Sequence, residues 1–108
     1  METRKLEFTE AEVQSALVTY SLRREIDLPE RNIEQVIIGE GTNPTVILEY
    51  VPGQPGDESD VEFSGEQVAA ALILYCKSQK IPLPRQAKKV LLEEDGGISM
   101  IIRIQWKE

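Results

Sequence analysis

Two stretches of the chain, Leu6 to Pro29 and Val61 to Pro84, repeat one pattern of apolar and polar positions at an offset of 55 residues. Nine of the 24 paired positions are identical, where ordinary composition would give about one or two. At an offset of 54 the apolar run at 36–38 matches 90–92, and 46–50 matches 100–104. The pattern predicts a single domain, 1–108, made of two repeats at about 5–51 (the first unit) and 61–106 (the second unit), joined by an acidic Gly/Pro loop at 52–60.

Each unit opens with a sequence typical of a helix start. Thr9 with Glu12, and Ser64 with Gln67, have the spacing of a capping box, in which each side chain bonds the backbone N–H of the other residue. Prolines follow in "IDLP" and "IPLP", so we predict helices from about 9 to 25 and from about 64 to 80. The residues expected to face the core are those at helical spacing: Val13, Ala16, Leu17 and Tyr20, and Val68, Ala71, Leu72 and Tyr75.

Two apolar runs separated by turn residues follow each predicted helix. They lie at 34–38 and 45–51 around "GEGTNP", and at 88–93 and 98–106 around "EDGG". Each pair predicts a β-hairpin. The second run of each pair alternates, so one set of side chains should face the core: Val46, Leu48 and Tyr50, and Ile98, Met100, Ile102, Ile104 and Trp106.

The predicted element order is αββ-αββ, and the fold class is α+β. A crossover from 45–51 through the second helix to 88–93 should place those two strands parallel. The expected result is one four-stranded, mostly antiparallel sheet with both helices on one face. In element order alone, this arrangement resembles a circular permutation of the ferredoxin-like fold, and it implies no function.

The sheet face without helices is the first candidate interaction surface. Ile47 and Ile101 alternate out of phase with the core set and occupy matched positions in the two units. A three-residue hairpin loop would put Ile37 and Leu91 beside them, whereas a two-residue loop would put Val36, Ile38, Val90 and Leu92 there. The partner-binding residues predicted from this pattern are Ile37, Ile47, Leu91 and Ile101.

Composition limits the chemistry that the chain can perform. It has 108 residues, no histidine and one cysteine, so the commonest general base and metal ligand is absent and no internal disulfide can form. Cys76 lies in an apolar helical stretch, where a thiol is buried and unreactive. The acidic run "DESD" lacks the spacing of a calcium loop. We therefore predict no enzyme, no catalytic residues, no metal and no cofactor.

Charge and hydropathy limit the location and the partners. No apolar run reaches the roughly 20 residues that span a bilayer, and "METRKLEF" lacks the apolar core of a signal peptide, so a cytoplasmic protein with no membrane partner is expected. The net charge of −7 disfavours nucleic acid. Residues 1–62 carry 5 basic and 14 acidic side chains, whereas 63–108 carry 7 and 5.

The basic side chains of the second unit give an alternative function. They cluster around the predicted end of its helix and could bind an anionic ligand or a nucleic acid: Lys77, Lys80, Arg85, Lys88 and Lys89. The leading expectation is different. It is a small non-enzymatic protein-interaction or regulatory module, a homodimer or a complex subunit, that contacts a protein, itself or another, through the open sheet face.

Overall fold

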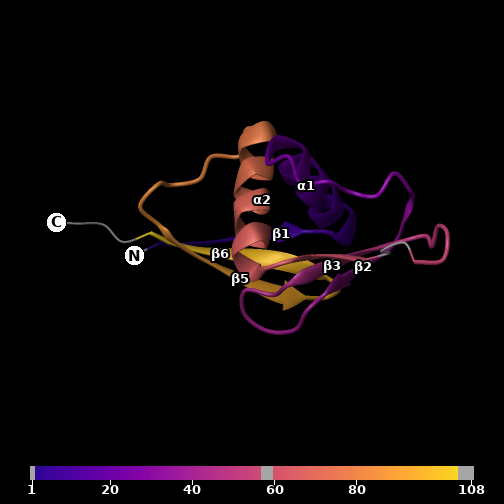
Figure 1. Cartoon of the computed structure of the whole chain (residues 1–108). Helices are drawn as coiled ribbons and strands as arrows, with labels where there is room; N and C mark the ends of the chain where they lie inside the picture. The colour runs from indigo at the N-terminus through magenta and orange to yellow at the C-terminus, as the bar shows by residue number, and fades with distance from the viewer. Residues whose placement is uncertain (1, 57–59, 105–108) are drawn as a thin grey trace.

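The computed structural model describes residues 2–56 and 60–104. Its elements follow the order strand–helix–strand–strand twice (Figure 1). The fold is α+β, with two helices and two three-stranded antiparallel sheets. The elements are β1 (Glu2–Phe8), α1 (Glu10–Arg23), β2 (Ile33–Ile38), β3 (Val46–Tyr50), β4 (Asp60–Phe63), α2 (Gly65–Ser78), β5 (Lys88–Glu94) and β6 (Gly97–Ile104).

The two helix starts form as the capping boxes predict. The Glu12 backbone N–H donates to Thr9 Oγ1 at 3.1 Å, and the Thr9 N–H donates to Glu12 Oε1 at 3.0 Å. Ser64 and Gln67 repeat both bonds at 3.2 and 2.9 Å. Backbone donors that the helix itself cannot satisfy are therefore bonded locally at the start of α1 and of α2.

Each helix is followed, two residues after its last residue, by a residue with a left-handed backbone, which comes before the prolines. Glu25 has φ 56° and Lys80 has φ 57°. The next N–H in each case bonds back across the turn, from Ile26 to the Ser21 carbonyl at 2.9 Å and from Ile81 to the Cys76 carbonyl at 2.8 Å. This is the hydrogen bond of a Schellman motif, which satisfies carbonyls at the helix end and usually has an apolar residue at this position.

The predicted single four-stranded sheet is wrong, because a strand precedes each helix. Sheet A has the order β1-β6-β5 and sheet B the order β2-β3-β4. The two predicted hairpins, β2-β3 and β5-β6, are present and antiparallel. Each hairpin receives its third strand from the other half of the chain, since β1 pairs with β6 and β4 pairs with β3. The expected parallel neighbours, β3 and β5, thus lie in different sheets, and Asp60 of the expected loop begins β4.

A loop links the two sheets. The stretch 41–43 lies against β5, where the Asn43 N–H donates to the Leu91 carbonyl at 2.7 Å and the Glu93 N–H donates to the Gly41 carbonyl at 3.1 Å. The Leu91 N–H in turn donates to Asn43 Oδ1 at 3.2 Å. Asn43 has φ 50°, a conformation that asparagine tolerates better than most residues. The loop therefore pairs with the edge of β5 as a short strand would.

The core lies between the helices and the sheets. Both helices lie on the same side of the strands (Figure 1) and contact each other. Six residues of the predicted inward set are buried: Val46, Leu48, Tyr50, Ile98, Met100 and Ile102. Ile104, at the end of β6, is only partly buried and packs against this core. Trp106, which the alternation also predicts to face the core, lies outside the described residues.

Candidate functional site

The helix-free sheet face is apolar at its centre in both sheets. In sheet B, Ile37 lies opposite Ile47, and 36% of its surface is exposed. In sheet A, Val90 lies opposite Ile101, and both are half-buried. These residues alternate with core residues along their strands, so they point away from the helices.

One predicted contact residue, Leu91, is misplaced. It lies opposite Met100, is only 2% exposed, and belongs to the core. The cause is the β5-β6 connection, in which only Asp95 and Gly96 separate the paired residues Glu94 and Gly97. This two-residue turn puts Val90 and Leu92 on the helix-free side, and both turn residues have the positive φ that such turns require.

The first hairpin has the other register. Seven residues, 39–45, separate its last pair, Ile38 and Val46, and a bulge follows Ile33. Ile37 therefore faces away from the helices, as the prediction for the contact surface required. Matched positions of the two units, 37 and 91, thus lie on opposite faces of their sheets.

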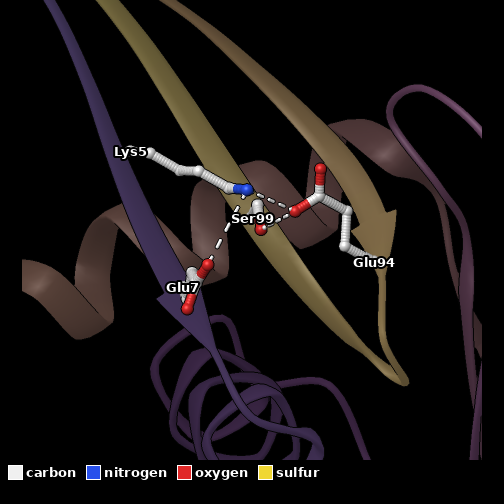
Figure 2. Close-up of polar contacts among 4 residues, drawn as sticks. All are labelled: Lys5, Glu7, Glu94 and Ser99. Atoms are coloured by element: carbon white, nitrogen blue, oxygen red, sulfur yellow. Dashed lines mark hydrogen bonds and ion pairs between the residues drawn. The ribbon is translucent and has the colours of Figure 1, made fainter.

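A polar network crosses the helix-free side of sheet A (Figure 2). Lys5 Nζ of β1 lies 2.7 Å from Glu94 Oε2 of β5 and 3.7 Å from Glu7 Oε1. Between them on β6, the hydroxyl of the buried Ser99 donates to Glu94 Oε2 at 2.8 Å. The hydrogen bond from Lys5, with that from Ser99, lowers the pKa of Glu94, and the bond to Glu94 raises the pKa of Lys5. Both groups stay charged near neutrality, so the network joins the three strands and is not suited to transferring protons.

The network gives a pH-dependent contribution to stability. A carboxyl whose pKa is lowered in the folded state stabilises the protein above its unfolded pKa, about 4.3, and loses that effect as the pH falls through the lower folded value. We expect Glu94→Gln to be less stable than wild type at pH 6 to 7 and to converge with it at low pH. Urea unfolding at a series of pH values measures this difference. If wild type and Glu94→Gln differed in the free energy of unfolding by the same amount at every pH, the prediction would be contradicted. The control is Glu34→Gln, because Glu34 lies outside the network.

The five basic residues of the alternative prediction are used in different ways. Lys89 Nζ donates to the Pro84 carbonyl at 3.0 Å and the Ala87 carbonyl at 3.4 Å, so it closes the loop before β5. Lys80 supplies the left-handed residue after α2, and Lys88 lies opposite Arg103 at the start of β5. Arg85 is exposed on the loop between them. Lys77 lines a groove between the helices.

That groove brings together residues that the sequence analysis did not connect. It has a volume of about 330 Å³ and lies between the end of α1 and the second half of α2. Arg23 and Arg24 share it with Lys77, although both arginines belong to the acidic first unit. One signal was available, because the positions that match these arginines in the second unit are Ser78 and Gln79. The lining residues are Tyr20, Arg23, Arg24, Ala70, Ile73, Leu74 and Lys77.

The reactive side chains of α2 are buried or bonded. Cys76 is fully buried, and burial raises the pKa of its thiol. The Tyr75 hydroxyl donates to Glu12 Oε2 at 3.2 Å, and its ring packs edge-on against Phe8 at 6.1 Å between centroids. Burial, together with the Glu12 carboxylate, raises the pKa of Tyr75. Neither group is set up as a nucleophile near neutral pH.

Carboxylates gather around a second hollow, of about 540 Å³, between the β1-α1 junction and the β5-β6 turn. Glu7, Glu10, Glu94 and Asp95 line it. Across 2–56 and 60–104, no group of three or more Asp, Glu, Cys or His side chains is arranged to hold a metal ion. Neither α1 nor α2 is long and apolar enough to cross a bilayer.

Comparison with known proteins adds no relative to this description. No protein-family model matches the chain, and neither the curated proteins nor the solved structures contain a significant match to it.

Proposed function

We propose that the protein is a small, non-enzymatic, cytoplasmic interaction module built from a duplicated unit, and that it forms a homodimer through the helix-free sheet face. The observation that carries this proposal is the apolar centre of that face. Ile37 is exposed opposite Ile47, and Ile101 lies half-buried opposite Val90. Apolar side chains grouped on an open face are typical of interaction surfaces.

The polar surroundings of the face suit a second copy of the chain. On the helix-free side of sheet A, Lys5 is paired with Glu7 and Glu94, whereas Lys88 and Arg103 lie together toward the other end. The same side of sheet B carries Glu49, Asp60 and Glu62. An antiparallel arrangement of two copies would bring Lys88 and Arg103 of one copy against the acidic side of the partner's sheet B. Such a two-fold contact uses the same surface patch on both copies.

The titratable side chains favour a binding role over an enzymatic one. Lys5 and Glu94 are stabilised in their charged forms by each other, and Cys76 and Tyr75 in their protonated forms by burial. Catalytic groups are usually shifted toward the working pH, which is the opposite direction in each case. The net charge of −7 supports a protein partner over a nucleic acid.

The homodimer is tested by light scattering after size-exclusion chromatography. We expect wild type to be a dimer at about 100 µM, and Ile37→Glu/Ile101→Glu to be a folded monomer, because the charges of the two copies would meet in an apolar contact. Leu22→Glu makes the same kind of change on α1, at a side chain that is 75% exposed and away from the sheet face, so it should remain dimeric.

Two results would contradict the proposal. A monomeric wild type at that concentration would exclude the homodimer, and a dimeric double variant would exclude the sheet face. Circular dichroism shows whether the double variant is folded. If it is not, the single change Ile37→Glu, at the more exposed position, decides the question in the same assay.

A further inference from the structure

The groove between α1 and α2 combines an apolar floor with a basic rim. Ala70, Ile73 and Leu74 of α2 form its floor, and Arg23 and Arg24 of α1 stand on its rim with Lys77 of α2. All three floor residues are only partly buried. From Val68 to Cys76, α2 has no charged side chain, so the part of its surface that remains accessible at the groove is apolar.

The three cations of the rim have no carboxylate partner within the described residues. The ion pairs described there join Arg4 to Glu2, and Lys5 to Glu7 and Glu94. Arg24 is instead held by an aromatic ring, with its guanidinium carbon 5.6 Å from the centre of the Tyr20 ring. In a chain of net charge −7, three unpaired cations around one groove form a local basic site.

The fold itself does not require the two arginines. The helix α2 ends with the same backbone hydrogen bond and left-handed residue as α1, yet it has Ser78 and Gln79 where α1 has Arg23 and Arg24. Leu22 of α1, in turn, stands where α2 has Lys77, and it is 75% exposed. The basic groove therefore exists on one side of the helix pair only.

We propose that this groove binds an acidic segment of a partner protein. Carboxylates of the segment pair with Arg23, Arg24 and Lys77, and an apolar side chain of the segment covers Ile73 and Leu74. Arginine suits the role because its planar fork can hold a carboxylate with two hydrogen bonds. The groove is lined by residues of α1 and α2, and both helices lie on the same side of the strands (Figure 1). It is therefore a second binding surface, distinct from the sheet face.

An acidic protein segment fits the groove better than a nucleic acid does. A nucleic acid carries phosphates along its whole length, whereas the groove offers three cations in a chain of net charge −7. An apolar floor makes no favourable contact with a charged sugar–phosphate backbone. It does stabilise a leucine-like side chain, by about 25 cal/mol for each Å² of apolar surface removed from water.

The test uses a synthetic amphipathic helix as the probe. The peptide has about 15 residues, the length at which an isolated helix begins to be stable, with Leu on one face and Glu elsewhere. We expect binding by fluorescence anisotropy that weakens as salt rises from about 50 to about 300 mM. The variant Arg23→Ser/Arg24→Gln/Lys77→Leu, which takes its residues from the matched positions, should bind at least about tenfold more weakly, or about 1.4 kcal/mol.

Matched controls distinguish binding at this groove from nonspecific electrostatic attraction between the acidic peptide and basic side chains elsewhere on the protein. Arg4→Gln/Lys80→Gln/Arg85→Gln removes the same charge outside the groove and outside the helix-free sheet face, and it should change the affinity by less than about twofold. Amide shifts of labelled protein should be confined to α1 and α2 when the peptide is added. A peptide with Ala in place of Leu should bind more weakly.

Four results would overturn the proposal. They are no binding up to about 1 mM peptide, an equal loss in both triple variants, equal binding of single-stranded DNA at the same salt, and amide shifts on the helix-free sheet face. The result of this test does not depend on whether the protein forms a homodimer. Light scattering measures association through the sheet face, whereas peptide titration measures the affinity of the groove.

Discussion

Leu91→Glu is expected to unfold the protein, whereas Ile37→Glu, at the matched position of the first unit, is expected to leave it folded. Leu91 is 2% exposed and faces the helices opposite Met100. A carboxylate there would be buried without a partner, at a cost of more than about 4 kcal/mol, which is a large part of the stability of a typical domain.

The matched substitution acts on the opposite face. Ile37 is 36% exposed on the helix-free side, so a glutamate there reaches water and should cost less than about 1 kcal/mol within one protomer. Far-ultraviolet circular dichroism and urea unfolding measure both variants. Leu91→Met retains the volume without the charge, and it should remain folded with a loss below about 1.5 kcal/mol. A folded Leu91→Glu with the stability of wild type would contradict the register described for β5 and β6.

Gly97→Ala is expected to lower the free energy of unfolding by about 2 to 3 kcal/mol, near the upper end for overpacking. A Cβ at position 97 would run into the carbonyl oxygen of Phe8. That oxygen cannot move aside easily, because Phe8 is paired with Ile98 on β6. The φ of Gly97 is not positive, so the cost is steric and does not come from backbone strain.

Gly65 is expected to behave in the same way. A Cβ there would lie 2.5 Å from the Asn43 carbonyl oxygen, and Asn43 is fixed by its bonds to Leu91 of β5. The control is Gly39→Ala, where the nearest atoms are Thr45 Oγ1 at 3.2 Å and the Thr45 carbonyl oxygen at 3.3 Å, so a shift of a few tenths of an ångström would relieve the contact. Its cost should stay below about 1 kcal/mol. Equal urea midpoints for Gly97→Ala and Gly39→Ala would show that the contact with Phe8 is not rigid.

Local signals in the sequence predicted the parts of the fold that local physics determines. The capping boxes placed both helix starts correctly, since the bonds involve residues three positions apart. Alternation in 46–50 and 98–102 identified the buried face of β3 and β6, because side chains of a strand point to opposite sides in turn. The sequence is compatible with a two-residue or a three-residue turn in the second hairpin, and the structure has the two-residue turn at Asp95 and Gly96.

The features of the fold that were predicted wrongly depend on pairing between residues far apart in the sequence. The strands β1 and β4 are short or rich in charge, with only Leu6 and Phe8, or Val61 and Phe63, to mark them. They become strands because β1 can pair with the edge of β6 and β4 with the edge of β3, and no local sequence pattern shows such pairing. The two hairpins also differ in their connections. The two-residue turn of the second puts Leu91 in the core, whereas the seven-residue loop of the first leaves the matched residue Ile37 exposed.

The basic groove escaped prediction for a similar reason. The arginines and Lys77 are more than fifty positions apart in the sequence, and only the packing of α1 against α2 brings them together. The sequence did contain the difference between the units at these positions. It could not show that the three changes converge on one site.

The exchange of β1 and β4 between the two halves of the chain imposes an order on folding. Sheet B needs only residues 33–63, which are neighbours along the chain, whereas sheet A needs Glu2–Phe8 to meet Gly97–Ile104. Closing so long a loop is slow, because its entropy must be lost before any pairing compensates for it. During synthesis, β1 therefore has no strand to pair with until β6 has been made. Charged side chains on an unpaired strand oppose its pairing with other chains, and β1 carries four of them: Glu2, Arg4, Lys5 and Glu7.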